Sequence, residues 1–246
     1  MEAKIYKIMA EVEDTHWWFL GRRAAVEKLI NKFVYKKEPL NILDAGCGSG
    51  GNFKYLSQYG SVVGLEPEMT AVDMAIKRGV AEKVVSGGFP VDKSQLNESS
   101  FDLVTMTDVL EHIEDDRNAL KDVYSLMKQN GHLVLTVPAM QFLWSHHDVS
   151  HHHFRRYSAS DLKLKLEAAG FKINYISYFN FWLFLPIAAV RLLKKKFKPN
   201  STDEDIDTSK GIMNSIFKVI FKSETMFIGS IPFPFGVSVI ACVTKE

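Results

Sequence analysis

The sequence predicts one α/β domain built on a mostly parallel β-sheet with helices on both faces. Strand and helix patterns alternate over residues 41–137, and such alternation requires crossover connections that cover both faces of a parallel sheet. The chain has 246 residues, of which 46% are hydrophobic, and this is enough apolar material for a single core.

The predicted elements follow one another at short spacing. The first five strands are expected at residues 41–43, 61–66, 83–86, 101–105 and 132–137. The helices between them are expected at residues 52–59, 69–78 and 116–129. Acidic residues at the start of the third helix and Lys128 near its end match the helix dipole. Gly131 is expected to end this helix.

The flanking parts of the chain complete this plan. Residues 5–35 have a helical pattern, and residues 171–178 and 237–243 have the pattern of strands. Residues 158–161 resemble a capping box with Asp in place of Glu or Gln, which predicts a helix ending at Gly170. We therefore divide the chain into an N-terminal helical cap at residues 1–38, a core at residues 39–178 and 236–246, and an insertion at residues 179–235.

The insertion contains an apolar segment at residues 179–193 that is followed at once by four lysines. It is interrupted by polar residues and falls short of the roughly 20 apolar residues that a spanning helix needs. Peripheral contact with a membrane and packing on the domain are both open readings. Residues 201–209 are acidic and nearly free of apolar side chains, so they are expected to form a mobile loop.

Composition excludes some function classes. The formal net charge is +1, so no basic field for nucleic acid is expected. The two cysteines, Cys47 and Cys242, are far apart and form no disulfide framework. The N-terminus has no apolar core of a signal peptide. These features together predict a cytoplasmic protein, with peripheral contact to the inner face of a membrane as the alternative.

The loop after the first strand has two readings. Gly46, Gly48 and Gly51 match the dinucleotide pattern G-x-G-x-x-G, and Glu66 ends the next strand, where an acid holds ribose hydroxyls. Asp44 separates the readings, because a carboxylate beside the loop repels a pyrophosphate. It suits S-adenosylmethionine, which carries an ammonium and a sulfonium and has no phosphate. The alternative is that Asp44 only stabilises the turn.

At this point the chain resembles the class I S-adenosylmethionine-dependent methyltransferases. The matching motifs are Leu43-Asp44-Ala45-Gly46-Cys47-Gly48-Ser49-Gly50, Gly64-Leu65-Glu66-Pro67, Ser100-Phe101-Asp102-Leu103-Val104, Asp108-Val109-Leu110-Glu111-His112-Ile113 and Asn130-Gly131-His132-Leu133. The resemblance covers roughly residues 40–178 and returns at the last strand. It implies a Rossmann-like, mostly parallel seven-stranded sheet whose last strand is antiparallel.

The resemblance also implies roles for individual residues. The methionine portion of the cofactor is expected to face Asp44, Gly46, Cys47 and Gly48, and Glu66 is expected to bind the ribose hydroxyls. Pro67 and Met69 are expected near the adenine, with Thr107 and Asp108 on the floor of the site. Many relatives carry an acid that contacts the adenine amine where this chain has Gly88. Phe89 either replaces that contact by stacking or belongs to the core.

The N-terminal run His16-Trp17-Trp18-Phe19 with Arg22-Arg23 resembles an element of one methyltransferase subgroup that folds over the cofactor. Two adjacent Trp residues do not share a helix face, so Trp17 is predicted to contact the cofactor. Arg23, or its neighbour Arg22, is predicted to pair with the cofactor carboxylate. An aromatic packing helix with solvated arginines is the alternative.

Residues 144–157 form the most unusual segment, and they follow the fifth strand at the sheet end where open α/β sheets bind ligands. The candidate bases are His146, His147 and His151. The candidate acceptor-binding residues are Arg155, Arg156 and Tyr157, since the guanidinium groups suit phosphate or carboxylate. Neighbouring histidines diverge and match no structural zinc spacing, so no metal is predicted. A solvated loop is the alternative.

The sequence therefore predicts an S-adenosylmethionine-dependent methyltransferase that acts on a small-molecule or glycolipid-like acceptor. The run from Asp148 to Tyr157 resembles methyltransferases of polysaccharide and glycolipid pathways, which implies a lipid-linked acceptor. The alternatives are an inactive protein that still binds the cofactor and an NAD-type oxidoreductase.

Overall fold

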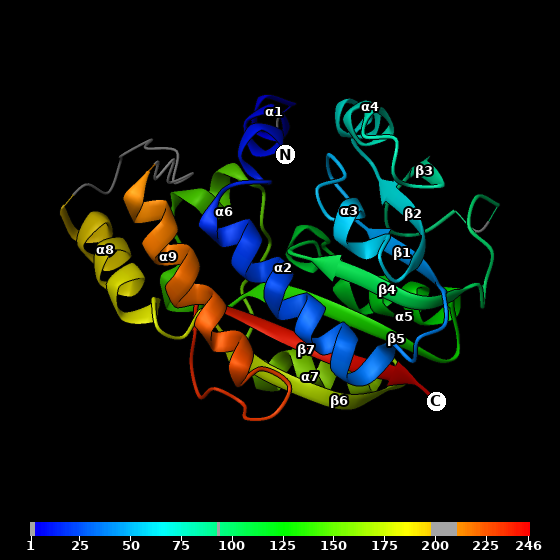
Figure 1. Cartoon of the computed structure of the whole chain (residues 1–246). Coiled ribbons are helices and arrows are strands. Elements are labelled where there is room, and N and C mark those ends of the chain that lie inside the picture. The colour runs from blue at the N-terminus through cyan, green and yellow to red at the C-terminus, as the bar shows by residue number, and fades with distance from the viewer. Residues whose placement is uncertain (1–2, 93, 198–210) are drawn as a thin grey trace.

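The computed structural model describes residues 3–92, 94–197 and 211–246. A seven-stranded sheet in the order β3-β2-β1-β4-β5-β7-β6 lies between two layers of helices (Figure 1). The strands are β1 (Leu40–Ala45), β2 (Gly60–Glu66), β3 (Lys83–Ser86), β4 (Phe101–Thr107), β5 (Met127–Pro138), β6 (Phe171–Phe179) and β7 (Ser238–Lys245). The predicted acidic loop at residues 201–209 lies outside the described residues, as does Lys198.

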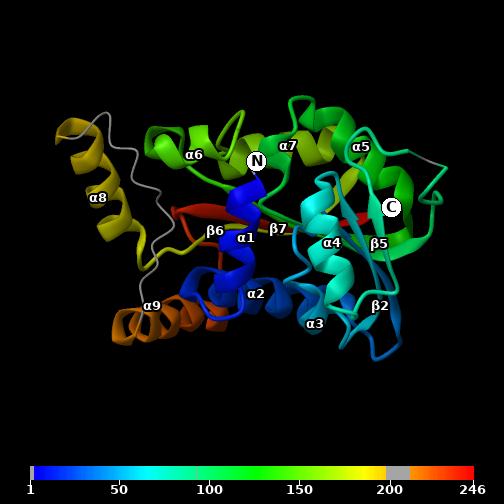
Figure 2. The ribbon, with the colours of Figure 1, turned by 90° about the horizontal axis from the view of Figure 1, so that it is seen from above.

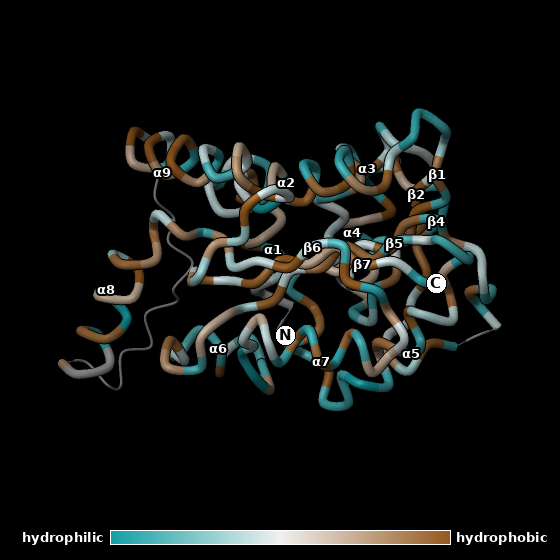
Figure 3. The backbone as a smooth tube through the Cα atoms, turned by 90° about the horizontal axis from the view of Figure 1, so that it is seen from below, coloured by the Kyte–Doolittle hydropathy of each residue, from teal (hydrophilic) through white to brown (hydrophobic). Residues whose placement is uncertain are grey.

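The helices flank this sheet. They are α1 (Ala3–Val12), α2 (Trp17–Leu29), α3 (Phe53–Leu56), α4 (Met69–Lys77), α5 (Asp116–Leu126), α6 (His146–Ser150), α7 (Ala159–Ala168), α8 (Phe184–Phe197) and α9 (Ile212–Ser223). Short turns of π or 3-10 helix are η1 (Ile30–Val34), η2 (Leu110–His112), η3 (Gln141–Leu143) and η4 (Glu224–Met226). Figure 3 shows α2, α3 and α9 on one face of the sheet and α5 and α7 on the other.

Strand directions confirm the predicted fold class. Strands β1 to β5 pair in parallel, whereas β7 runs antiparallel to both β5 and β6. The chain leaves β1 toward β2 and β3 on one side and returns to β4 on the other side. Side chains at the carboxyl ends of β1, β2 and β4 therefore meet at a topological switch point, where sheets of this kind bind ligands.

Two buried apolar clusters hold the layers together. One lies between the sheet and α5 and α7, and it includes Leu120, Val123 and Leu166. The other lies between the sheet and α2 and α9, and it includes Val26 and Phe221. The strands contribute to both clusters because successive side chains point to opposite faces, as expected for a sheet buried on both sides.

Local structure differs from the prediction at two places. The helix expected over residues 5–35 is interrupted, because the side chain of His16 caps a new helix by accepting from the Trp18 amide at 3.3 Å. Lys128 and Gly131 do not lie at the end of a helix, since α5 ends at Leu126 and both residues lie inside β5, which begins at Met127. A Cβ at Gly131 would lie 3.0 Å from the carbonyl oxygen of Phe101 on β4, so glycine allows the two strands to approach.

The predicted insertion contains α8 and α9, of which α9 packs beside α2 and α8 lies at one end of the molecule (Figures 1 and 3). Both helices carry large apolar side chains in contact with solvent. Within residues 3–92, 94–197 and 211–246, no helix has the length and apolar content needed to cross a bilayer.

Candidate active site

The glycine loop joins β1 to α3, and its amides are used to hold the loop against β2. The amides of Gly46 and Cys47 both donate to the carbonyl of Leu65, at 2.7 and 3.0 Å. The amide of Gly48 donates to the Glu66 carboxylate at 2.9 Å. These three amides are thus engaged within the protein, which is unfavourable for a dinucleotide whose pyrophosphate needs free N–H groups.

Gly48 keeps the space above the loop open. Its φ is +55°, and a Cβ built on it would have no heavy atom within 4 Å. A side chain here would be strained and would fill that space. A ligand can therefore approach the backbone closely at this position.

Asp44 lies at the end of β1 and is fully buried. Its Oδ1 accepts from the Thr105 hydroxyl at 2.7 Å, while its buried Oδ2 has no hydrogen-bond partner among the described residues. Burial raises the pKa of Asp44 to about 6, and the bond from Thr105, the nearby Asn52 amide and the charges of two arginines only partly oppose this effect. A buried, unpartnered carboxylate oxygen beside an open glycine loop fits a cationic group such as the cofactor ammonium.

Glu66 ends β2, where the resemblance places a ribose-binding acid, and it is 3% exposed. Its Oε1 accepts from the Tyr6 hydroxyl at 3.0 Å and from the Glu68 amide at 3.1 Å. Burial raises the pKa of Glu66 despite these bonds. The phenol of Tyr6 thus contacts the oxygen expected to bind a ribose hydroxyl.

The segment between α1 and α2 is tied to the glycine loop by charged groups. Glu13 accepts from the Ser49 hydroxyl and pairs with Arg78, whose Nε donates to the Ser49 carbonyl at 2.7 Å. Arg23 donates to Asp14 at 3.2 Å. Figure 2 shows α1 beside α4, and a hollow of about 290 Å³ between them is lined by Ala10, Ser49, Met74, Lys77 and Arg78.

Arg22 is the arginine that reaches the floor of the site. Its guanidinium donates to the Asp108 carboxylate at 2.6 Å, and the same carboxylate accepts from the Thr136 hydroxyl at 2.9 Å. The Thr107 hydroxyl accepts from Asn52 at 3.1 Å. The structure thus brings the predicted pair Thr107 and Asp108 together with Arg22 and Asn52.

The predicted adenine end is more open. Pro67 is exposed, and the Met69 side chain is 57% exposed, with its sulfur 3.1 Å from the Ser86 hydroxyl. A Cβ at Gly88 would lie 3.4 Å from the Pro67 ring. Phe89 is half-buried and packs against the core cluster, which favours the packing alternative for this residue.

Trp17 does not lie with these groups. Its ring is buried against Phe217 and Phe221, with centroids 5.5 and 5.9 Å away, and its amide donates to Asn214 at 2.8 Å. All three partners lie on α9, the helix that packs against α2. Trp17 thus packs between α2 and α9 in this structure, and its contact with the cofactor stays a prediction.

The two arginines of the segment 144–157 are engaged inside the protein. Arg156 is buried and forms a bidentate pair with Asp148, at 2.8 and 2.9 Å. Arg155 pairs with Asp116 at 2.8 Å, and the buried Tyr157 hydroxyl donates to the same Asp116 at 2.9 Å. Acids of the same chain thus accept from these donors, and the contact of Arg155, Arg156 and Tyr157 with an acceptor stays a prediction.

The candidate bases differ in environment. His146 is exposed, whereas the rings of His147 and His151 lie against each other, with centroids 3.9 Å apart and a tilt of 32° between the ring planes. Burial, together with the charge of neighbouring histidines, lowers the pKa of His147 well below its usual value, and burial also lowers that of His151. Nδ1 of His147 is buried without a hydrogen-bond partner among the described residues.

Glu111 and His112 lie in η2, directly after β4. Burial and the charge of Asp108 raise the pKa of Glu111 well above its usual value. Burial also lowers the pKa of His112 to about 3. The backbone amide of Phe154 donates to the Glu111 carbonyl at 2.8 Å, so the segment 144–157 folds back onto the carboxyl end of β4.

Several residues of this site were missed by sequence reasoning. They are Tyr6, Glu13, Asn52 and Arg78. Arg22 was named in the sequence analysis, but only as the alternative to Arg23. Tyr6, Glu13 and Arg78 carry no pattern in the sequence, since they reach the site from helices or turns far from the loop along the chain, whereas Asn52 directly follows the loop at the start of α3.

At the switch point, one carboxylate oxygen of Asp44 has no hydrogen-bond partner among the described residues, and the amides of the glycine loop donate within the protein. These features are those expected of a methyltransferase. The chain belongs to the methyltransferase-domain family, which it matches over residues 19–176. This match confirms the class predicted from the sequence, the S-adenosylmethionine-dependent methyltransferases.

Curated relatives match only part of the chain. It is 36% identical over 101 residues to the mitochondrial ubiquinone biosynthesis O-methyltransferase of Schizosaccharomyces pombe, which covers 39% of this chain and 36% of that protein. It is 25% identical over 128 residues to the ubiquinone biosynthesis O-methyltransferase of Coxiella burnetii, covering 48% and 54%. The chain thus spans about a third to a half of the length of these relatives.

Solved structures agree with the fold over nearly the whole chain. A SAM-dependent methyltransferase from Thermotoga maritima superimposes with a TM-score of 0.60 at 18% identity, covering 98% of this chain and 97% of that one. At this identity the likeness supports the fold alone.

Proposed function

We propose that this chain transfers the methyl group of S-adenosylmethionine to a hydroxyl oxygen of a small or lipid-linked acceptor. The unpartnered, buried Oδ2 of Asp44 beside the open Gly48 carries this proposal, because it is placed for an ammonium group. The bound cofactor supplies a methyl carbon activated by its sulfonium. The protein has to hold the acceptor oxygen close to that carbon and to exclude water.

The oxygen acceptor is supported by the curated relatives, which are O-methyltransferases of ubiquinone biosynthesis. An oxygen nucleophile loses its proton during transfer, and a neutral imidazole accepts it. His147 and His151 remain the candidate bases, since their lowered pKa values keep them neutral at pH 7.

The lipid-linked acceptor is supported by the surface of α8 and α9. Exposed apolar side chains on or beside these helices are Trp182, Leu185, Val190, Leu192, Leu193, Phe197, Ile212, Met213, Ile216 and Val219. A concave surface of about 590 Å³ along α9 is lined by residues of that helix and Gly211. Exposed apolar area of this extent is typical of contact with a lipid or a membrane surface.

Lysines accompany this apolar surface. Lys222 is exposed and Lys218 is half-buried, and both lie on α9. We propose that the surface rests on an anionic bilayer, from which a lipid-linked acceptor is taken. The attraction of lysines to anionic headgroups adds to the burial of apolar side chains.

Transfer of labelled methyl tests the acceptor. The wild-type chain is incubated with methyl-labelled S-adenosylmethionine and one of three acceptors: a dihydroxybenzene, the same ring with a long prenyl tail, and a lipid-linked sugar. We expect the tailed acceptors to be labelled much faster than the tailless ring. Equal labelling of the two rings would reject the lipid-linked acceptor, and thermal stabilisation by NAD in place of S-adenosylhomocysteine would reject the enzyme class.

Sedimentation with vesicles tests the membrane contact. The double variant Ile212→Ser with Val219→Ser should bind anionic vesicles less than the wild type does. Leu164→Ser is the matched control, because Leu164 on α7 is 66% exposed but lies away from α8 and α9. If the wild-type protein does not sediment with anionic vesicles even at low salt, the membrane contact is rejected, whereas the proposal of methyl transfer is not affected.

A further inference from the structure

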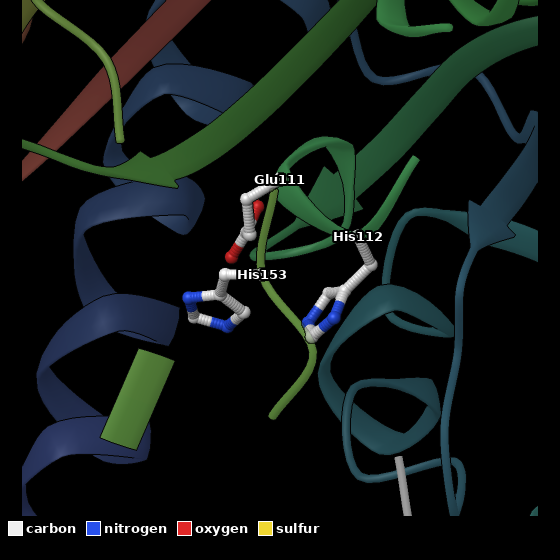
Figure 4. A group of neighbouring side chains, drawn as sticks. All are labelled: Glu111, His112 and His153. Atoms are coloured by element: carbon white, nitrogen blue, oxygen red, sulfur yellow. The ribbon is translucent and has the colours of Figure 1, made fainter. Parts of the chain in front are cut away.

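Three side chains with metal-binding atoms converge beside the candidate active site. Glu111 and His112 come from η2, and His153 comes from the turn after α6 (Figure 4). One ligand atom from each residue lies within 4.8 Å of the others. The sequence prediction of no metal considered the histidines of residues 144–157 alone, whereas this group combines two segments about 40 residues apart.

The carboxylate of Glu111 needs a partner. The residue is 1% exposed, and neither of its side-chain oxygens has a hydrogen-bond partner among the described residues. An ionised carboxylate without a partner is costly to bury, and a protonated one still leaves an unpaired O–H donor. A bound cation removes this cost directly.

His153 is already oriented as a ligand. Its Nδ1 donates to the Asp148 carboxylate at 2.9 Å, and Asp148 is itself fully buried and held by Arg156. With its proton on Nδ1, the ring presents the lone pair of Nε2 on its other side. Metal-binding histidines are commonly oriented by a carboxylate in this way.

His112 completes the group from the other side. Its ring lies edge-on to that of His153, with centroids 4.5 Å apart. The bond from the Phe154 amide to the Glu111 carbonyl, at 2.8 Å, fixes the two segments relative to each other. The ligand atoms are thus contributed by a braced part of the fold, and small side-chain rotations bring them to one ion.

We propose that Glu111, His112 and His153 bind one divalent cation and that Zn²⁺ is the ion this donor set fits best. Two imidazole nitrogens and one carboxylate oxygen are a common set for zinc sites that keep a fourth position open. The buried Asp148 and Arg156 then act as positioning residues for His153. The proposal goes beyond the methyl transfer and does not depend on it.

Titration with Zn²⁺ alone tests the site. Dialysed wild-type chain, Glu111→Gln, His153→Asn and His152→Asn are titrated by calorimetry, and each variant is first shown to melt cooperatively. His152→Asn is the matched control, because His152 is the exposed neighbour of His153 and its φ of 57° is accepted by Asn. We expect one tightly bound Zn²⁺ in the wild type and the control, and about ten-fold or weaker binding in the other two.

A second measurement needs no folded variant. On addition of Zn²⁺ to the wild type, the imidazole NMR signals of His112 and His153 should shift, while those of His146 and His152 should not. The proposal is overturned if the wild type binds no stoichiometric Zn²⁺, if His153→Asn binds as tightly as His152→Asn, or if the signals of His112 and His153 do not move.

Discussion

Replacing Asp44 by Asn separates the function of this residue from its effect on stability. Burial raises the pKa of Asp44 from 3.8 to about 6. The folded state therefore holds the Asp44 proton more tightly than the unfolded state. This contribution to stability is fully present below pH 4 and is lost as the pH rises through about 6. At neutral pH the buried charge then costs the cofactor-free protein about 3 kcal/mol.

Asn carries no charge at any pH, so the variant does not have this cost. In the variant, the amide nitrogen that takes the position of Oδ2 lacks an acceptor. We therefore expect the free energy of unfolding to fall by about 1–3 kcal/mol at every pH. The change with pH is therefore the informative quantity. From pH 4 to pH 7.5, the free energy of unfolding of Asp44→Asn relative to wild type should rise by about 2–3 kcal/mol.

Urea unfolding at these two pH values measures the change. Asp73→Asn, the same substitution at an exposed position of α4, controls for the loss of one charge. In the same samples, Asp44→Asn should bind S-adenosylhomocysteine about ten- to a hundred-fold more weakly, because the ammonium loses its charged partner. A relative stability that does not change with pH would refute the argument from burial, and unchanged ligand binding would refute the proposed role of Asp44.

Three further results are expected. Tyr6→Phe removes a hydroxyl that donates to Glu66, so S-adenosylhomocysteine should bind about five-fold more tightly by calorimetry; weaker binding would mean that Tyr6 contacts the ligand. Glu66→Gln should weaken the same binding by about 1–3 kcal/mol, and unchanged affinity would exclude a contact with the ribose. Arg156→Met removes the bidentate guanidinium from the buried Asp148, which keeps only its bonds from His153 and Ser145 among the described residues, so the free energy of unfolding measured in urea should fall by about 3–5 kcal/mol. Lys163→Ala, which breaks the exposed pair with Glu167, should cost less than about 1 kcal/mol, and an equal loss in both would contradict this reasoning.

Local sequence patterns were sufficient for the fold and for one side of the cofactor site. Alternating strand and helix patterns predicted the parallel sheet, because side-chain periodicity within each element is set by its own backbone geometry. Asp44 and Gly48 were predicted in the same way, since the end of a strand and the glycine turn after it are neighbours along the chain. The structure adds which oxygen of Asp44 lacks a partner.

Contacts between distant segments depended on the tertiary structure. Tyr6 meets Glu66 only because α1 folds across the end of the sheet, and no pattern near either residue indicates this contact. Arg156 was predicted as a free donor because the sequence does not show that the chain folds back after α6 and brings its guanidinium against Asp148 of that helix.

Glu111 and His153 show the same limit, since the first lies after β4 and the second lies after β5 and α6. A residue's type determines which bonds it can form, and this much is read from the sequence. Which partner it meets depends on packing over the whole chain, and this decides whether a charge is free for a ligand or neutralised within the protein.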